Sequence, residues 1–288
     1  MPLQQVEDRS GLDAGRLRLG LVGCGIGLSR TPAMHEAEAA AQGLSCRYEL
    51  LENDAGAQGE LTDILDRCEA AGFAGLNVTF PYKQAVIPHL DRLSDAAQRI
   101  GAVNTVVFRG GKRFGHNTDF RGFSEGLRQG LPGVPLETVL LIGAGGAGAA
   151  LAHAMADLGV KRLLIADTRK DAAAALAGAV GAHAQAVGDL AAAAAEAQGI
   201  VNATPVGMRD MPGTPIDPDL IGARHWVADI IYFPLETALL KAARERGCRT
   251  LSGEGMAVFQ AVRAFELFTG RAADAERMRD TFRRLGPK

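Results

Sequence analysis

The sequence of 288 residues has few aromatic side chains, no paired cysteines and no long apolar run. Aromatic residues make up 5% of it, and no apolar run approaches the roughly 20 residues that a membrane-spanning helix requires. Cys24, Cys46, Cys68 and Cys248 are scattered without C-x-x-C spacing, which argues against a disulfide framework and a zinc site. We therefore expect a cytoplasmic protein without a metal centre.

The sequence also lacks an excess of charge of either sign. Its 31 Lys and Arg residues are balanced by 33 Asp and Glu residues, a formal net charge of -2 at pH 7. Nucleic acids and anionic membranes are bound through an excess of positive charge, so we expect neither as a main partner. Residues 1–16 are polar and acidic, which predicts a short disordered arm and not a secretory signal.

Glycine is abundant, with 36 residues, in a chain long enough for two domains. In the first half, short apolar runs predict strands at 18–22, 48–52, 75–79 and 103–107. Amphipathic runs predict helices at 33–42 and 60–71, which Gly43 and Gly72 end.

A second series of elements follows a polar stretch near 128–137. Its strands are predicted at 139–142, 162–166, 199–203, 226–231 and 249–251. Its helices are predicted near 147–158, 171–179, 190–197, 235–246, 255–269 and 272–285. Such alternation predicts an α/β fold of parallel sheets with crossover helices.

The strongest single motif follows the strand predicted at 139–142. Gly143, Gly145 and Gly148 have G-x-G-x-x-G spacing between a buried strand and a helix. Glycine serves the tight turn, the close approach of backbone to a pyrophosphate and the packing of helix on sheet, while the helix N-terminus offers N–H groups to the phosphates. A flexible turn is the alternative, and the order of the surrounding elements favours the dinucleotide site.

Asp167 lies where a dinucleotide site needs an acid. It ends the second strand of this half, about 20 residues after the last glycine, where a carboxylate would hold the 2′-hydroxyl of the NAD ribose. The same carboxylate would repel the 2′-phosphate of NADP, whereas Arg169 and Lys170 would attract it. The sequence favours NAD. The segment NATPVGM at 202–208 is a candidate for the nicotinamide side, and a plain turn explains it equally well.

In the first half, polar side chains lie at the ends of apolar runs. Ser29 and Thr31 precede a predicted helix, which suits a substrate carboxylate, and a lysine with an aspartate, Lys83 and Asp119, would relay the proton of an alcohol that becomes a ketone. Local roles remain open for each. Thr31 and Asp119 would serve as helix caps, Lys83 as a solvated lysine and Asn104 as a satisfied buried amide.

The segments SRTP, NVTFPYK, GAVNT, HNTD, GAGGAG, NATPVGM, DIIYFPLET and GEGMAVFQAV occur in this order. In them the chain resembles the shikimate/quinate dehydrogenase family over about residues 18–285. The resemblance implies two α/β domains flanking a cleft. Residues 17–119 and 255–288 would bind substrate, and 120–254 would form a doubly wound, Rossmann-type NAD domain. A homodimer is a family expectation.

The resemblance also implies roles for individual residues. Lys83 and Asp119 would be the catalytic pair. The substrate would be bound by Ser29, Thr31, Asn77, Thr79, Asn104, Tyr232 and Gln260. The cofactor would be bound by Gly143, Ala144, Gly145, Gly146, Ala147, Gly148, Asp167, Arg169, Thr204, Met208, Gly253 and Met256.

Two segments depart from the NADP-dependent biosynthetic members of this family. Those members carry an N-R-T motif after the second Rossmann strand, where this chain has Asp167 and Thr168. They typically show H-S-x-S where this chain has Leu28-Ser29-Arg30-Thr31. A threonine at the second hydroxyl position resembles the quinate-accepting, NAD-linked branch.

The reaction expected from the resemblance is the reversible NAD-dependent oxidation of the ring hydroxyl of quinate or shikimate to 3-dehydroquinate or 3-dehydroshikimate. Lys83 would accept the hydroxyl proton, and Asp119 would orient Lys83 and the hydroxyl. An NADP-dependent biosynthetic shikimate dehydrogenase, an aminoshikimate-type dehydrogenase and an NAD-sensing regulatory protein on the same fold remain alternatives. The sequence does not choose between the shikimate pathway of aromatic amino acid biosynthesis and quinate catabolism.

Overall fold

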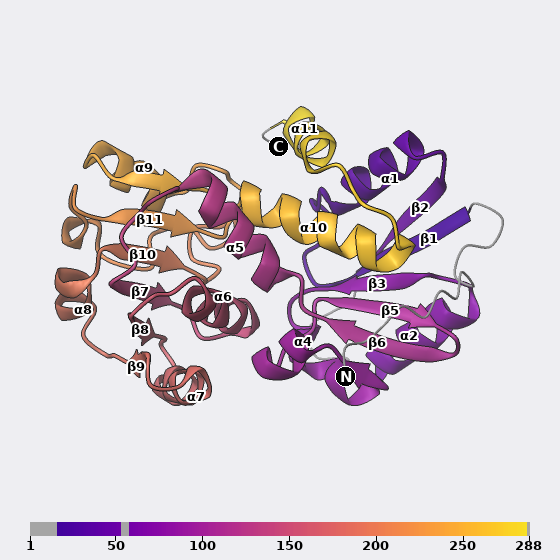
Figure 1. The fold of residues 1–288 in the computed structure, drawn as a ribbon, viewed down its shortest axis with the longest axis horizontal. Coiled ribbons are helices and arrows are strands. Elements are labelled where there is room, and N and C mark those ends of the chain that lie inside the picture. Colours follow the sequence, from indigo (N-terminus) through magenta and orange to yellow (C-terminus); the bar gives the residue numbers. More distant parts are fainter. Residues whose placement is uncertain (1–15, 53–57, 287–288) are drawn as a thin grey trace.

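The computed structural model describes residues 16–52 and 58–286, and it forms two lobes that are each built on a six-stranded sheet (Figure 1). The N-terminal lobe contains strands β1–β6 and the C-terminal lobe contains β7–β12. Of the arm predicted at 1–16, residues 1–15 lie outside the described ranges and Arg16 begins β1. The predicted fold class, α/β with a Rossmann-type half, is confirmed.

The sheet of the N-terminal lobe runs in the order β2-β1-β3-β5-β6-β4. Its strands are β1 (Arg16–Gly23), β2 (Ser45–Glu52), β3 (Gly75–Val78), β4 (Arg92–Leu93), β5 (Thr105–Arg109) and β6 (Lys112–His116). The helical segments between them are α1 (Thr31–Ala41), α2 (Gln58–Ala70), α3 (Tyr82–Ala85), η1 (Ile87–His89) and α4 (Asp95–Ile100). β1 pairs in parallel with β2 and β3, as the predicted crossover helices require.

The prediction of parallel pairing is wrong for β5 and β6. β5 pairs antiparallel with both β3 and β6. Gly110 and Gly111 join β5 to β6 with φ of 58° and 66°, the positive values that a two-residue hairpin turn requires. The sequence of β6, KRFGH, is polar and half-exposed, so it lacks the apolar run by which the other strands are recognised.

The sheet of the C-terminal lobe is parallel throughout, in the order β12-β11-β10-β7-β8-β9. Its strands are β7 (Thr138–Ile142), β8 (Arg162–Ala166), β9 (Ala184–Ala186), β10 (Gly199–Asn202), β11 (Trp226–Asp229) and β12 (Arg249–Leu251). Its helical segments are α6 (Gly146–Asp157), α7 (Lys170–Val180), α8 (Leu190–Glu196), η2 (Pro218–Leu220) and α9 (Ala238–Glu245). This is the Rossmann strand order, in which ligands bind at the carboxyl ends of the strands where the order reverses, between β7 and β10.

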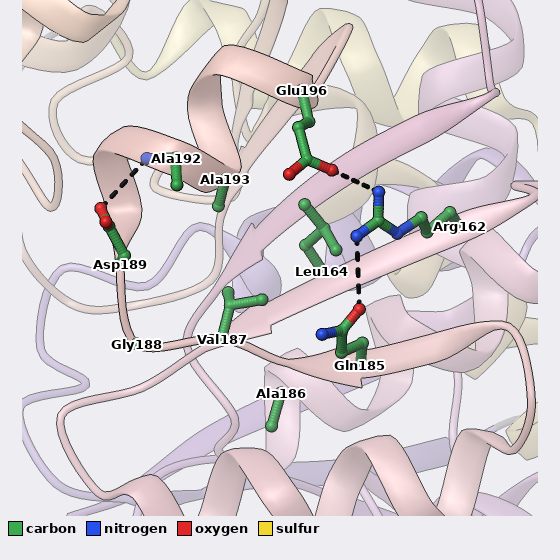
Figure 2. Close-up of a pocket in the computed structure, with 10 residues that line it drawn as sticks. All are labelled: Arg162, Leu164, Gln185, Ala186, Val187, Gly188, Asp189, Ala192, Ala193 and Glu196. Carbon is green, nitrogen blue, oxygen red and sulfur yellow. Dashed lines mark hydrogen bonds and ion pairs between the residues drawn. The ribbon is translucent and has the colours of Figure 1, made fainter.

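Helices α8 and α9 cover one face of this sheet, above buried side chains that include Leu140 and Leu164. The seven-residue helix α8 leaves a hollow of about 280 Å³ beside β8 and β9 (Figure 2). Arg162 crosses one end of this hollow, where it pairs with Glu196 and donates a hydrogen bond to Gln185.

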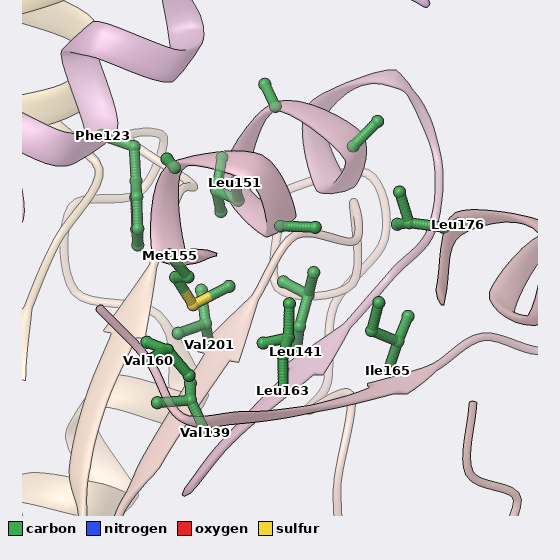
Figure 3. Packing of buried hydrophobic residues seen from close by; sticks show 14 of the residues in the cluster. Phe123, Val139, Leu141, Leu151, Met155, Val160, Leu163, Ile165, Leu176 and Val201 are labelled. Atoms are coloured by element: carbon green, nitrogen blue, oxygen red, sulfur yellow. The ribbon is translucent and has the colours of Figure 1, made fainter. Parts of the chain in front are cut away.

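Helices α6 and α7 cover the opposite face. In Figure 3, Leu151 and Met155 of α6 and Leu176 of α7 pack toward Leu141 and Ile165 of the sheet. Each of these side chains is buried, and burying one fully contributes about 1.5–3 kcal/mol relative to leaving it exposed. This packing fixes the N-terminus of α6 at the carboxyl end of β7.

Two long helices connect the lobes: α5 (Asp119–Gly130) and α10 (Glu254–Thr269), which lie against each other between the two sheets (Figure 1). They approach closely because α5 presents glycine at the contact. A Cβ on Gly122 would lie 2.7 Å from the carbonyl oxygen of Met256. The last helix, α11 (Ala275–Arg284), packs on α1. The crossing fixes the first residue of α5, Asp119, relative to Gln260 on α10.

The predicted helix ends agree with the structure to within three residues, and the largest differences are the starts of α9 and α11, which are each three residues later than predicted. Gly43 and Gly72 follow α1 and α2 with positive φ, as expected of helix stops. The helix predicted at 235–246 begins three residues later because Thr237 caps it, accepting a backbone hydrogen bond at 3.2 Å. Elements such as α3, β4 and β9 are too short for hydrophobic periodicity to reveal.

Candidate active site

The two side chains that the sequence suggests as a proton relay are in contact. Lys83 Nζ donates a hydrogen bond to Asp119 Oδ2 at 2.6 Å, and the two side chains are only 18% and 7% exposed. The local alternatives do not hold. Lys83 is not a solvated lysine. The start of α5 is capped by Asn117, whose Oδ1 accepts the N–H of Phe120 at 3.2 Å, and not by Asp119, the first residue of the helix. Burying two charges is costly, so a pair like this contributes little to the stability of the fold. A role in proton transfer is therefore the better explanation for its presence.

A buried network of amides and hydroxyls lies beside this pair. Asn77 Oδ1 accepts a hydrogen bond from the Tyr48 hydroxyl at 2.8 Å, and Asn77 Nδ2 donates to Thr105 Oγ1 at 3.1 Å. Asn104 Oδ1 accepts from the backbone N–H of Thr118 at 2.7 Å, and Asn104 Nδ2 donates to Thr118 Oγ1 at 2.9 Å. The amide groups of Asn104 and Asn77 are therefore both buried and hydrogen bonded, which for Asn104 agrees with the structural role that the sequence left open.

Sequence reasoning missed three members of this network: Tyr48, for which the sequence offers no signal, and the two threonines Thr105 and Thr118. Each threonine follows an asparagine, in Asn104-Thr105 and Asn117-Thr118, and this repeated pair is the signal that could have found them. Thr118 also connects the network to α10, because its Oγ1 lies 3.5 Å from Gln260 Oε1. The predicted residues Asn77, Asn104 and Gln260 are thus brought together.

Thr79 lies at the carboxyl end of β3, next to the end of β1. Its backbone N–H donates to the carbonyl of Val22 at 3.0 Å, and its side chain is half-buried. A Cβ on Gly23 would lie 2.3 Å from Thr79 Cγ2, so a larger residue at Gly23 would displace Thr79. Because Gly23 has no side chain, it leaves the space at the end of the sheet that the Thr79 side chain occupies.

Ser29, Thr31 and Tyr232 come together from two lobes. Ser29 Oγ accepts the backbone N–H of Thr31 at 3.3 Å, and the side chains of Ser29 and Tyr232 are hydrogen bonded. Burial raises the pKa of the Tyr232 phenol, the Asp119 carboxylate adds to the rise, and the Arg30 charge and the bond to Ser29 oppose it. Thr31 does not cap α1, because Arg30 occupies the cap position and Thr31 is the first residue of the helix.

The glycine loop at residues 143–148 has the geometry of a phosphate cradle. Gly143 has a φ of 109°, and a Cβ on Gly148 would lie 2.0 Å from the Gly143 carbonyl oxygen. No larger side chain fits at Gly148, and the first N–H groups of α6 have no partner within the helix. A Cβ on Gly146 would lie 3.5 Å from Lys83 Cβ, so the loop is next to the Lys83–Asp119 pair.

Asp167 is a fixed anion beside this loop. Its Oδ2 accepts the N–H of Ala144 at 2.7 Å, and its Oδ1 accepts the N–H of Arg169 at 2.8 Å. Burial acts to raise the pKa of the Asp167 carboxyl, but these two hydrogen bonds and the Arg169 charge hold the pKa below its ordinary value. The Arg169 side chain is 67% exposed, with its Nε 3.8 Å from Asp167 Oδ1.

The segment after β10 is folded by its own buried asparagine. Thr204 Oγ1 donates to Asn202 Oδ1 at 2.7 Å, and Asn202 Nδ2 donates to the carbonyl of Val206 at 3.1 Å. Met208 follows with a 42% exposed side chain. Met256 instead packs partly against the core beneath α6. The structure therefore places Met208 at the surface of the loop and Met256 at the start of α10.

Sequence reasoning also missed Asp229, at the end of β11. Its carboxylate accepts hydrogen bonds from Asn202 Nδ2 at 3.1 Å, from the N–H of Ile231 at 3.0 Å and from Thr237 Oγ1 at 2.8 Å. Burial raises the pKa of Asp229 to about 6, although these hydrogen bonds lower it. The next segment approaches α10, since a Cβ on Gly253 would lie 2.2 Å from the Ile230 carbonyl oxygen.

The hollow of Figure 2 is separate from these groups, because none of the residues that line it is a predicted site residue. Within residues 16–52 and 58–286, no three His, Cys, Asp or Glu side chains are placed to hold a metal ion. No helix in the same part of the chain has the length and apolar character needed to cross a membrane.

The fold and this geometry define a two-lobed α/β protein in which a Rossmann lobe presents a glycine loop to a lysine–aspartate pair on the other lobe. Two family profiles match the chain. The profile "Shikimate dehydrogenase substrate binding domain" matches residues 21–106, and "Shikimate 5'-dehydrogenase C-terminal domain" matches residues 253–281.

Curated relatives and solved structures match over nearly the whole chain. The quinate/shikimate dehydrogenase (NAD(+)) of Corynebacterium efficiens is 49% identical over 277 residues, 92% of this chain and 96% of the relative. The shikimate dehydrogenase (NADP(+)) of Streptomyces avermitilis is 49% identical over 272 residues, 90% of this chain and 92% of the relative. The structure of quinate dehydrogenase from Corynebacterium glutamicum in complex with NAD has a TM-score of 0.87 at 46% identity, covering 93% of this chain and 98% of that one.

The chain belongs to the shikimate/quinate dehydrogenase family, as its motifs predict.

Proposed function

We propose that this protein is an NAD-dependent dehydrogenase that reversibly oxidises the ring hydroxyl of quinate or shikimate to 3-dehydroquinate or 3-dehydroshikimate. One observation carries the proposal: the Lys83–Asp119 pair, 2.6 Å apart, lies against Gly146 of the glycine loop. A group able to move a proton is thereby next to the loop suited to a dinucleotide. Oxidation of an alcohol to a ketone requires both.

Lys83 and Asp119 divide the proton chemistry between them. Lys83 Nζ takes up the hydroxyl proton as a neutral amine during oxidation, and as an ammonium it gives a proton to the ketone oxygen during reduction. Asp119 Oδ2 holds Nζ in place and stabilises the ammonium that forms. NAD, when bound, supplies the acceptor for the hydride. The proton taken up in oxidation leaves Lys83 for solvent before the next turnover, and the 18% of the Lys83 side chain that is exposed gives it a route.

The substrate is held by neutral polar groups. We assign its carboxylate to Ser29, Thr31 and Tyr232, which converge near the N-terminus of α1, where the helix dipole favours an anion. We assign its ring hydroxyls to Thr79, Asn77, Asn104 and Gln260. Hydroxyls and amides suit a polyhydroxylated ring because each can donate and accept hydrogen bonds.

Residues of the C-terminal lobe fit NAD. Gly143, Gly145, Gly146 and Gly148, with Ala144 and Ala147, would cradle the pyrophosphate, and the close approach of Gly148 to Gly143 supports this. Thr204, Met208, Gly253 and Met256 would lie on the nicotinamide side.

Overall similarity does not select the cofactor, because relatives named for NAD and for NADP are both 49% identical. Asp167 supports NAD, since a partly buried carboxylate whose pKa is held below its ordinary value repels a 2′-phosphate. Arg169 would contact the adenosine side of the cofactor from its exposed position.

Three broader assignments belong to the same proposal. Residues 17–119 with 255–288 would form the substrate-binding domain, and 120–254 the NAD-binding domain. A cytoplasmic location is supported by the scattered spacing of the four cysteines, which is not that of a disulfide framework. A homodimer is proposed from the family resemblance alone, and its mass in solution tests it.

The proton relay is tested by the variants Lys83→Met and Asp119→Asn, with the exposed Lys112→Met as the matched control. Each relay variant should lower kcat for quinate or shikimate oxidation by at least about a hundredfold, the usual contribution of a positioned acid–base group, while KM for the substrate changes little. The Lys112 variant should match the wild type. Near-normal kcat in Lys83→Met would refute the assignment of Lys83.

A further inference from the structure

Arg30 is a buried arginine to which the proposed site gives no task. It lies between Ser29 and Thr31, the two hydroxyl residues assigned to the substrate carboxylate, and only 4% of it is exposed. Burial lowers the pKa of its guanidinium, while the nearby Glu254 carboxylate and Tyr232 raise it. An arginine buried at this position needs partners that compensate for its lost hydration.

The guanidinium of Arg30 contacts α11 on one side and the loop after β11, which belongs to the C-terminal lobe, on the other. Its two terminal nitrogens donate to the carbonyl oxygens of Phe282, at 2.9 Å, and Gly286. These carbonyls lie at the C-terminus of α11, where the last carbonyls have no partner within the helix and a cation is favourable. The guanidinium carbon also lies 4.3 Å from the centre of the Phe282 ring.

The opposite face of the guanidinium packs on the loop that follows β11. Its carbon lies 4.5 Å from the centre of the Phe233 ring. Phe233 is adjacent to Tyr232, and the two rings are 5.1 Å apart. The Tyr232 ring is 6.1 Å from the Phe282 ring, in an edge-on contact. Arg30 is therefore enclosed between a helix of the N-terminal lobe and the loop that carries Tyr232 from the C-terminal lobe.

We propose that Arg30 is a positioning residue for the carboxylate end of the substrate, a role that rests on the proposed function. By joining the Phe233 loop to α11, it holds the Tyr232 hydroxyl beside Ser29 and Thr31. The planar guanidinium can stack on two rings and bind two carbonyls at once, which the single ammonium of lysine cannot. A purely structural cap of α11 is the competing explanation, and it predicts no effect on substrate binding.

Kinetics of the full-length protein separate these explanations through the variants Arg30→Met and Arg30→Lys. Both should raise KM for quinate or shikimate by about tenfold, the effect of losing one well-placed hydrogen bond, with KM for NAD and kcat nearly unchanged. Arg47→Met is the matched control, because the Arg47 side chain is 76% exposed and pairs with Glu49 on the same strand, away from Tyr232. If Arg30→Met fails to fold, Arg30→Lys, which keeps the charge, decides by the same criterion.

A second measurement asks whether Arg30 acts through Tyr232. In a Tyr232→Phe background, Arg30→Met should raise KM for the substrate by less than about twofold, because the hydroxyl it positions is gone and the two effects are not additive. Additive effects, or a lower Tm with unchanged KM in both Arg30 variants, would overturn the inference and leave a structural cap. Wild-type protein without turnover of quinate or shikimate would instead refute the proposed function, and with it the role of Arg30.

Discussion

Asp229 connects the two loops that follow β10 and β11, and replacing it tests how these loops are held. The carboxylate is 2% exposed and accepts hydrogen bonds from Asn202, Ile231 and Thr237. Asn202 shapes the Thr204 segment. The variant Asp229→Asn keeps the shape of the side chain and removes its charge and its titration.

The magnitude follows from the pKa of Asp229, which burial raises from 3.8 to about 6. Between these two values the folded protein binds more protons at Asp229 than the unfolded chain does, so the free energy of unfolding falls as the pH rises. The stabilisation is complete below the unfolded pKa and is lost once the pH has passed about 6. A rise of roughly two pKa units corresponds to about 3 kcal/mol.

Urea unfolding at a series of pH values measures this directly. The free energy of unfolding of the wild type, minus that of Asp229→Asn, should fall by about 2 kcal/mol between about pH 4 and pH 7, because part of the stabilisation is already lost at pH 4. Asp63→Asn is the control, because Asp63 is an exposed residue of α2. Parallel pH curves for the wild type and Asp229→Asn would refute the account of Asp229.

Two further substitutions test the cofactor loop and the core of the N-terminal lobe. Gly148→Ala should raise KM for NAD at least about tenfold, because its Cβ would lie 2.0 Å from the Gly143 carbonyl oxygen, whereas Gly178→Ala, with no atom within 4 Å, should have no effect. Equal KM values for NAD in Gly148→Ala and the wild type would contradict the proposal that this loop binds the pyrophosphate. Burial lowers the pKa of His35 to about 3, so this side chain costs stability as the pH falls below 6.5. His35→Leu should therefore reduce the acid loss of unfolding free energy by about 2 kcal/mol between about pH 6.5 and 4.5, and exposed His183→Leu should not. If the unfolding free energy of His35→Leu falls with decreasing pH as steeply as that of the wild type, the account of His35 is wrong.

The geometry of the glycine loop at residues 143–148 is the part of the candidate site that the sequence alone predicts best. The tight turn at Gly143 and its contact with Gly148 are local, so they follow from the spacing of glycines between a strand and a helix. Lys83 and Asp119 are 36 residues apart on different elements. No periodicity relates them, and their pairing could be predicted only through the motifs shared with a family.

The residues that escaped prediction have partners distant in the chain. Arg30 binds a carbonyl 252 residues away, and Asn202 and Asp229 meet across two neighbouring strands. Such contacts depend on the packing of whole elements, for which a short sequence window contains no signal. The β5–β6 hairpin was missed for a related reason, because the polar strand β6 is recognisable as a strand only when it pairs with β5.

The proposed reaction is tested most directly by initial rates of the purified protein with quinate and shikimate, each with NAD and with NADP. We expect turnover of at least one of the two acids, with kcat/KM for NAD at least about tenfold above that for NADP because Asp167 repels a 2′-phosphate. Asp167→Ser should narrow that ratio. A preference for NADP would contradict the cofactor assignment, and no turnover in any of the four combinations would contradict the reaction itself.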